Sequence, residues 1–339
     1  MKRHISPRLI AVATIVAGSL ACGPALAQAP RSYILSTATT GGTYYPVGVA
    51  LATLAKVKLQ TTEKIDISAI SSAGSTENVK LMRENQAQLA IILGLVARNA
   101  WLGKDEFAQV GPQRHLRGIT SLWANVDHHI QRKSLTKTGT LEDLKLLYGR
   151  KYSIGARNSG LESLNKFMFP NLGIDYEKFD LVYQGYGPSG DSFSNGQIDG
   201  TNASAGIPVA SVTQVFAKSA KDATLLEVTD EELKKLDGGT GLFYHYTIKA
   251  GTYPGLDRDI KTSAYVNFLA VNDALPENDV YLITKTIYDN LPFLYNIHAS
   301  TKEMTLERAM SGVPLPLHKG AIRFYREKGL TIPAHLIEN

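Results

Sequence analysis

Three short turns rich in small and hydroxyl-bearing residues are the segments of this 339-residue sequence best suited to hold a ligand. They read Thr-Thr-Gly-Gly-Thr at 39–43, Ser-Ser-Ala-Gly-Ser at 71–75 and Arg-Asn-Ser-Gly at 157–160. Each turn separates a β-prone run from a helix-prone run, so each is expected to end at a helix N-terminus. The free N–H groups and partial positive charge of such an end attract anions. One turn of this kind is more often a simple helix cap, whereas three together favour an anion-binding site.

Two of the turns carry signals of helix capping. Ser159 is followed three residues later by Glu162, which is the spacing of a capping box. Ser75 with Asn78 is a weaker version of the same pattern. Glu162 is therefore expected to cap its helix rather than to contact a ligand.

Tyrosine and arginine side chains beside the turns add candidate hydrogen-bond donors. Tyr44, Tyr45 and Tyr183 adjoin the turns and offer neutral hydroxyl groups. Arg157 has the chemistry to form a bidentate pair with a ligand carboxylate. An exposed loop arginine that touches no ligand is an equally good interpretation of this residue.

Motifs that would indicate an enzyme are incomplete. The run Gly-Tyr-Gly-Pro-Ser-Gly at 185–190 has the spacing of a dinucleotide fingerprint. However, Pro188 interrupts the helix that this motif requires and no acidic residue follows at the right distance, so a turn is expected. Ser163-x-x-Lys166 and Lys-Thr-Gly at 137–139 occur in the wrong order for a penicillin-binding or β-lactamase site. We predict no catalytic residue.

The histidines do not form a metal-binding pattern. His128 and His129 are adjacent, so in a strand they point to opposite faces and cannot easily share one ion. The other histidines lack ligand spacing. Neither a metal nor a cofactor is expected.

The first 27 residues have the pattern of a secretory signal peptide. A basic start precedes an apolar run at 9–20, and Ala-Leu-Ala ends at Ala27. The apolar run is too short to span a bilayer. We therefore expect export to the periplasm with cleavage after Ala27.

The single cysteine and much of the excess positive charge belong to this first segment. Cys22 invites a lipoprotein interpretation, but Leu20 stands one place too late for a lipobox. Without the segment, the chain has no cysteine for a disulfide or a thiolate nucleophile. The net charge of +5 also falls towards neutrality, which is not a nucleic-acid-binding balance.

The rest of the chain alternates short β-rich runs with helix-prone runs, as is typical of an α/β protein with mostly parallel sheets. Two apolar β-prone runs, 116–131 and 264–272, are expected to cross between two parts of the molecule. The length also favours two lobes over one. We predict a discontinuous first lobe, 28–125 plus 268–339, and a second lobe, 126–267.

Short motifs in a fixed order resemble those of the TAXI family, the solute receptors of tripartite ATP-independent periplasmic (TRAP) transporters. The resemblance extends from about residue 33 to residue 330. The motifs that carry it are Gly41-Gly42-Thr43-Tyr44-Tyr45-Pro46-Val47-Gly48, Ala73-Gly74-Ser75-Thr76-Glu77-Asn78, Ser159-Gly160-Leu161-Glu162, Ala250-Gly251-Thr252-Tyr253-Pro254-Gly255, Leu317-His318-Lys319-Gly320-Ala321 and Tyr325-Arg326-Glu327-Lys328-Gly329.

The resemblance implies a type II periplasmic-binding-protein fold, in which two α/β lobes joined by a hinge close over a ligand in the cleft between them. It also implies that the ligand is a small carboxylate or amino acid that is handed to a TRAP membrane permease. The residues expected to bind the ligand are Thr40, Gly42, Thr43, Tyr44, Ala73, Gly74, Ser75, Arg157, Asn158, Ser159, Gly160, Tyr183 and Ser204.

Departures from the family pattern refine the expected ligand. Ala38 and Thr39 stand where the family usually has glycines, and Leu-Gly-Leu at 93–95 replaces a polar Gln-Ser-Asp. If that segment lines the cleft, its loss of polar groups disfavours an ammonium group. We expect a carboxylate that lacks an amino group and carries an apolar or aromatic body.

The function predicted from the sequence is solute capture outside the cytoplasm by a monomer, with no chemistry performed. One alternative is a ligand-binding sensor that presents its closed form to a membrane receptor. Another is a periplasmic serine hydrolase, which would need a nucleophile elbow and a histidine partner that the sequence lacks.

Overall fold

The computed structural model describes residue 1 and residues 29–338. Apart from Met1, the predicted signal peptide, its cleavage site after Ala27 and Cys22 lie outside the described residues. Within the described part of the chain, none of the helices has the length and apolar character needed to cross a membrane.

Strands and helices alternate along most of the chain. The strands are β1 (Arg31–Ser36), β2 (Ile65–Ile70), β3 (Leu89–Leu93), β4 (Leu116–Arg132), β5 (Lys151–Ser153), β6 (Asp180–Val182), β7 (Gly200–Ala205), β8 (Ala223–Leu225), β9 (Tyr244–Ile248) and β10 (Ile260–Asn272). The α-helices are α1 (Tyr44–Glu63), α2 (Ser75–Arg83), α3 (Gly94–Leu102), α4 (Gly160–Asn171), α5 (Tyr186–Ser194), α6 (Ala210–Ser219), α7 (Asp230–Leu236), α8 (Glu277–Asp289), α9 (Leu291–Tyr295) and α10 (Lys319–Glu327).

The strands form one sheet in which the same strand order occurs twice. The main path is β2-β1-β3-β10-β4-β7-β5-β6, while β8 pairs with β4 and β9 pairs with β10. The first half therefore has the order β2-β1-β3-β10-β4, and the second half has the order β6-β5-β7-β4-β8. In the first half, the long strand β10 lies between β3 and β4. In the second half, the long strand β4 lies between β7 and β8. Each of these two strands also continues beyond that half.

The longest strand, β4, connects the two halves. It pairs with β10 from Leu116 to Val126 and with β7 from Val126 to Gln131. Nearly all of its side chains are buried, as expected for a strand covered by helices on both faces. The predicted lobe boundary after residue 125 coincides with this change of partner, and the boundary after residue 267 falls within β10. The division into lobes itself stays a prediction.

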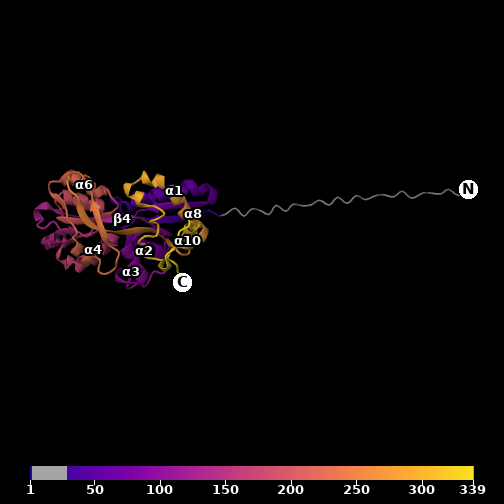
Figure 1. Ribbon diagram of the computed structural model, residues 1–339, viewed down its shortest axis with the longest axis horizontal. Helices are drawn as coiled ribbons and strands as arrows, with labels where there is room; N and C mark the ends of the chain where they lie inside the picture. Colours follow the sequence, from indigo (N-terminus) through magenta and orange to yellow (C-terminus); the bar gives the residue numbers. More distant parts are fainter. Residues whose placement is uncertain (2–28, 339) are drawn as a thin grey trace.

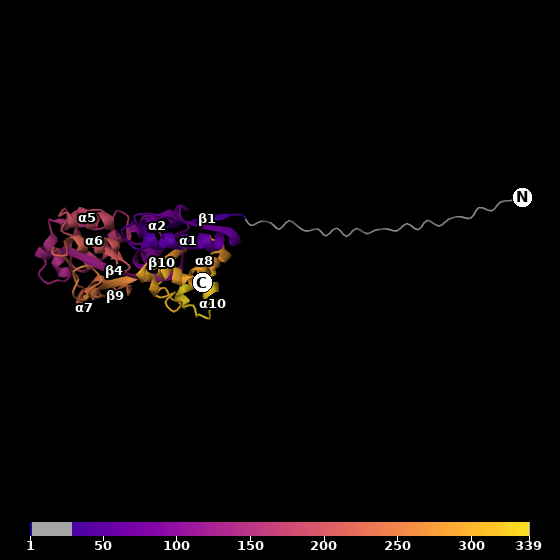
Figure 2. The same ribbon diagram turned by 90° about the horizontal axis from the view of Figure 1, so that it is seen from above.

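The strand directions bring several helix N-termini to the middle of the molecule. β1 is parallel to β2 and β3, and β5 is parallel to β6 and β7. The two sets run in opposite directions, because β3 is antiparallel to β10, β10 to β4, and β4 to β7. Helices α1 to α5 follow β1, β2, β3, β5 and β6 in turn, so they begin where the carboxyl ends of the two sets face each other. Figure 1 shows α4 and α6 at one end of the molecule, α1, α8 and α10 at the other, and β4 between them, and Figure 2 shows α5 and α6 at that same first end.

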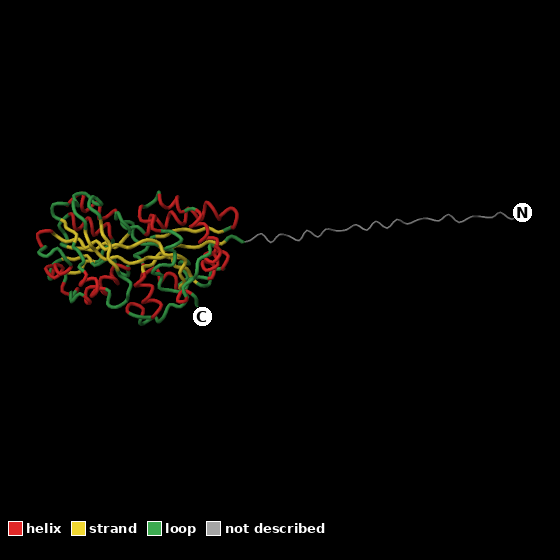
Figure 3. Tube along the Cα trace, viewed as in Figure 1, coloured by secondary structure: helices red, strands yellow, loops and turns green. Residues whose placement is uncertain are grey.

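Helices lie on both sides of the sheet, so its strands are largely enclosed (Figure 3). Two clusters of buried hydrophobic side chains stabilise this arrangement. The larger includes Trp123, Tyr152 and Phe268, and the smaller includes Phe193 and Tyr253. Burial of each large apolar side chain contributes about 1.5–3 kcal/mol. The predicted α/β architecture is thus present in a single two-part sheet.

Candidate functional site

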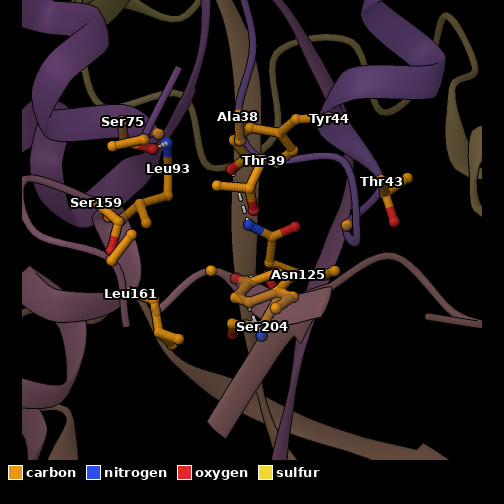
Figure 4. A pocket seen from close by; sticks show the side chains of 18 residues that line it. Ala38, Thr39, Thr43, Tyr44, Ser75, Leu93, Asn125, Ser159, Leu161 and Ser204 are labelled. Carbon is orange, nitrogen blue, oxygen red and sulfur yellow. Dashed lines mark hydrogen bonds between the residues drawn. The ribbon is translucent and has the colours of Figure 1, made fainter. Parts of the chain in front are cut away.

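The N-terminal ends of five helices meet around one pocket. The N-cap residues of α1 to α5 all line it, and they are Thr43, Gly74, Leu93, Ser159 and Gly185. Three of these helices belong to the first half of the sheet and two to the second. Figure 4 shows residues from both halves facing the same space. The pocket therefore lies between the halves, where the helices begin.

The pocket is small in this conformation. Its empty volume, including the mouth, is about 480 Å³, but the centre of a water molecule can enter only about 40 Å³ of it. One water needs about 10–15 Å³ by the second measure, so the enclosed part has room for about three waters. This size suits a compact solute rather than a nucleotide or a peptide.

None of the described residues that line the pocket carries a charged side chain. The polar lining residues are Thr39, Thr43, Tyr44, Ser75, Asn125, Ser159, Tyr186 and Ser204. The rest of the wall consists of Ala38, Gly42, Ala73, Gly74, Leu93, Ala156, Gly160, Leu161, Gly185 and Ala205. Backbone N–H groups and helix dipoles are thus the sources of positive potential in the pocket wall.

Nine of the thirteen residues predicted to bind the ligand lie in the pocket wall. They are Gly42, Thr43, Tyr44, Ala73, Gly74, Ser75, Ser159, Gly160 and Ser204. The structure places Thr40, Arg157, Asn158 and Tyr183 outside this set.

Arg157 and Tyr183 contact each other rather than the pocket. The Arg157 guanidinium lies 3.7 Å from the centre of the Tyr183 ring, a cation–π contact. Arg157 is exposed, as the loop interpretation of this residue predicts. Asn158 is exposed as well, and its carbonyl accepts a hydrogen bond from the Glu77 N–H at 3.0 Å.

Helix α4 begins as the sequence predicts. The Ser159 hydroxyl accepts the Glu162 N–H at 3.1 Å, and the Glu162 carboxylate accepts the Asn158 N–H at 2.7 Å. Glu162 also pairs with Lys166. The prediction that Glu162 caps the helix is confirmed.

The weaker cap predicted at α2 is wrong. The N-cap of α2 is Gly74 at φ 132°, a backbone conformation that favours glycine. Ser75 is the first helical residue, and its hydroxyl accepts the Leu93 N–H at 3.1 Å. Asn78 donates to the carbonyls of Thr37 and Ile91 instead. Serine and asparagine here tie the helix to neighbouring strands.

The turn predicted at 185–190 is also wrong, because α5 begins there. Gly185 is the N-cap, and Pro188 falls in the first turn of the helix. Proline is tolerated in a first turn because the N–H it lacks has no intrahelical partner in any case. The sequence interpretation gave this proline too much weight as a helix breaker.

The sequence interpretation missed lining residues that come from distant strands and helices. Asn125 lies on β4, Leu161 on α4 and Tyr186 on α5. Asn125 is 2% exposed, and an amide side chain within a β-prone run was the available signal. Leu93, whose segment was expected to make the cleft less polar, does line the pocket.

Tyr44 is buried and receives hydrogen bonds from the pocket wall. Asn125 Nδ2 donates to its phenol oxygen over 2.8 Å. Burial raises the pKa of Tyr44 well above its usual value, and the hydrogen bonds from Asn125 and Ser75 act in the opposite direction. Tyr44 therefore stays protonated and can donate to a ligand.

Ser204 belongs to a buried polar network behind the pocket. Its hydroxyl donates to Asp127 and accepts from Tyr265, while its carbonyl accepts the Tyr186 hydroxyl at 2.7 Å. Burial raises the pKa of Asp127 to about 6, against the hydrogen bonds from Ser204, Ser263 and Asn202. Asp127 is thus ionised at neutral pH, although no cation is among these partners.

The two-part α/β sheet, with an uncharged pocket at its helix N-termini, has the architecture of a periplasmic-binding-protein fold. Among the described residues, no three His, Cys, Asp or Glu side chains lie close enough together to hold a metal ion. The chain belongs to the NMT1-like family, whose family model matches residues 35–329.

Solved structures with similar folds have low sequence identity. A protein from Bordetella bronchiseptica RB50 is 14% identical with a TM-score of 0.50, and the match covers 87% of this chain and 82% of that chain. The periplasmic aliphatic sulphonate binding protein of Escherichia coli is 11% identical with a TM-score of 0.44, over 88% and 84% of the two chains. The alkanesulfonate-binding protein of Xanthomonas axonopodis pv. citri, bound to MOPS, is 12% identical with a TM-score of 0.46, over 89% and 92%. The likeness concerns the fold alone, and the α/β fold predicted from the sequence is confirmed.

Proposed function

We propose that this protein is an extracytoplasmic receptor that captures a small organic acid as its carboxylate and delivers it to a TRAP-type membrane permease. The observation that carries this proposal is the meeting of five helix N-termini in a pocket without a charged side chain. Each N-terminus stabilises an anion by about 0.3–1 kcal/mol at the surface, and by more where water is excluded.

The wall chemistry favours a carboxylate without an amino group. An ammonium group in the pocket would need a carboxylate partner, and none lines it. Leu93, Leu161 and the alanines of the wall offer contacts to an apolar body instead. This supports the ligand expected from the sequence over an amino acid.

Contacts across the pocket mouth support capture by closure of the two halves. The Glu77 N–H at the start of α2 donates to the Asn158 carbonyl just before α4. Nearby, the hydroxyls of Thr76 and Ser163 lie 3.0 Å apart. Because both halves form the walls, a ligand enters when these contacts open and is enclosed when they form.

The predicted location and permease rest on the sequence. The signal-peptide pattern of the first 27 residues supports export, and the ordered motifs that resemble the TAXI family support a TRAP-type partner. We include the lobes 28–125 plus 268–339 and 126–267 in the proposal as the two bodies that close.

A thermal-shift screen with carboxylates, sulfonates and amino acids tests the ligand class. A ligand at 100 times its Kd stabilises the folded state by about 2.7 kcal/mol, which raises Tm by several degrees. We expect stabilisation by acids without an amino group. A response to amino acids alone would contradict the proposed class, and no response to any anion would contradict the function.

Gly160→Ala tests whether ligands bind in this pocket. A Cβ at Gly160 would lie 2.4 Å from Leu93 Cδ2, so the side chain of Leu93, which lines the pocket, must shift. We expect the ligand-induced shift to disappear while the free protein remains folded. Gly187→Ala is the matched control, because a Cβ there meets nothing within 4 Å. Equal ligand shifts in the two variants would place the binding site elsewhere.

A further inference from the structure

Ser204 lines the pocket, and its hydroxyl proton is already donated to Asp127. A carboxylate only accepts hydrogen bonds, so in the Ser204–Asp127 pair the serine is the donor. The Tyr265 hydroxyl donates to the same serine oxygen. A hydroxyl oxygen has two acceptor sites, so one remains. What Ser204 can offer to a ligand is a hydrogen-bond acceptor.

Tyr44 has the opposite polarity. Its phenol oxygen accepts from Asn125 at 2.8 Å. Burial raises the pKa of Tyr44 well above its usual value, so the hydroxyl keeps its proton. Tyr44 can therefore add a donor to the helix N-termini. Figure 4 shows Tyr44 above Asn125 and Ser204 below it, so the two polarities lie at different ends of the pocket.

The charge on Asp127 is what fixes the direction of the Ser204 proton. Asp127 is 1% exposed, and its oxygens accept from Ser204, from Ser263 at 2.6 Å and from Asn202 at 3.4 Å. Burying a carboxylate that only neutral groups stabilise costs free energy of desolvation. We therefore expect this carboxylate to perform a function behind the pocket. Holding Ser204 as an acceptor is a role that an apolar residue at this position cannot perform.

We propose that the ligand carries a hydrogen-bond donor as well as its carboxylate, so that it is a hydroxycarboxylate whose hydroxyl group donates to Ser204. This proposal rests on the proposed function. The carboxylate lies towards Tyr44 and the helix N-termini, and the hydroxyl lies towards Ser204. A keto group at the same place would set two acceptors against each other, and an unsubstituted acid would leave the remaining acceptor site of the serine oxygen unfilled. Asp127 acts as a positioning residue through Ser204.

Matched ligand series test the proposal by calorimetry at pH 7.5, where Asp127 is ionised. The probes are lactate, pyruvate and propionate, and separately 3-hydroxybutyrate, acetoacetate and butyrate. We expect the hydroxy acid to bind about tenfold or more tightly than its keto and unsubstituted partners, since leaving a buried polar group unpaired costs affinity. Equal binding within each series, or a preference for the keto acid, overturns the inference but leaves the proposed function standing. Absence of binding by all six acids and by the wider acid panel overturns both.

Variants separate the role of Ser204 from a structural one. Ser204→Ala should remove the preference by weakening the hydroxy acid about tenfold while leaving the unsubstituted acid nearly unchanged. Tyr265→Phe is the control, because it keeps the Ser204–Asp127 bond and should keep the preference. Asp127→Leu frees the Ser204 proton and should reduce the ratio of the two affinities towards one. If Asp127→Leu does not fold, the other two variants decide the matter: a preference that survives Ser204→Ala overturns the inference.

Discussion

Two adjacent histidines on β4 are buried in different ways. His128 is hydrogen-bonded to the Tyr253 hydroxyl at 2.7 Å and to the Val126 and Ala203 carbonyls. His129 is fully buried too, and among the described residues neither of its ring nitrogens has a hydrogen-bond partner. Burial lowers the pKa of His128 to about 4 and that of His129 to about 3. Both side chains are therefore neutral in the folded state over most of the acid range.

These histidines make the free energy of unfolding depend on pH. In the unfolded chain they take up protons below about pH 6.5, whereas the folded chain resists protonation. Their contribution is complete above pH 6.5 and is lost as the pH falls towards their folded values. Asp127 has the opposite sign: its raised pKa gives stability that is complete below about pH 3.8 and is lost as the pH rises through about 6. Between pH 7 and pH 5, each histidine should lower the free energy of unfolding by about 2 kcal/mol. Asp127 should offset part of this combined loss.

We expect His129→Leu to reduce the loss of stability in acid. The variant removes one of the two groups that take up a proton on unfolding, and it removes two buried nitrogens without partners. The free energy of unfolding, measured with urea, should fall between pH 7.5 and pH 5. We expect this fall to be about 2 kcal/mol smaller in the variant than in the unmodified protein. An identical drop in both proteins would mean that His129 is already protonated, or is solvated, in the folded state.

At the scale of elements, we expect the contact between α2 and α4 to contribute to the proposed closure of the pocket. Thr76 on α2 and Ser163 on α4 share a hydrogen bond, and the Thr76 hydroxyl also lies 3.5 Å from the Ser159 carbonyl. A hydrogen bond of this kind contributes about 0.5–1.5 kcal/mol. Since the contact joins the two halves, that free energy belongs to closure rather than to either half alone.

Thr76→Val should therefore weaken ligand binding without unfolding the protein. We expect affinity to fall about two- to tenfold, mainly through faster ligand release. Stopped-flow release and calorimetry measure the effect. Thr53→Val is the matched control, because Thr53 is exposed on α1 and its hydroxyl bonds only to the Val49 carbonyl of its own helix. Equal affinities in the two variants would exclude a closing role for the contact.

The elements show what the sequence can and cannot predict. The apolar run 116–131 predicts β4 nearly to its end, because periodicity and β-propensity are local properties. The pocket residue Asn125 was missed because its role depends on β4 lying opposite α1. That neighbourhood arises from strand order, which no local pattern contains.

The site was predicted best where it is built from turns and least where it depends on strands. Turn composition pointed to Gly42, Gly74 and Gly160. A Cβ at Gly42 would collide with the Tyr186 ring and one at Gly160 with Leu93, while Gly74 has a positive φ. The Asp127 network was not predicted, because a single acid in a strand does not reveal which hydroxyl groups will surround it.

At the scale of the whole molecule, an engineered disulfide across the contact between the halves would allow the proposed closure to be locked and released. Cys22 is the only cysteine of the sequence and lies outside the described residues. In protein that lacks residues 1–27, Thr76→Cys combined with Ser163→Cys places two thiols where hydroxyls now lie 3.0 Å apart. We expect oxidation in the presence of ligand to slow its release at least tenfold, and reduction to restore it. Unchanged release after disulfide formation, which mass spectrometry verifies, would show that ligand leaves without separation of α2 and α4.

The shared strands also set the order in which the chain can acquire its structure. β10 pairs with β3 and β4, which precede it by well over a hundred residues, and it lies between them in the sheet. The first half therefore stays incomplete until residue 272 has been made. Pairings so distant in sequence form slowly. For the export that we propose, this delay has a consequence: synthesis and translocation of an extended polypeptide can proceed before the central strand is available to complete the sheet.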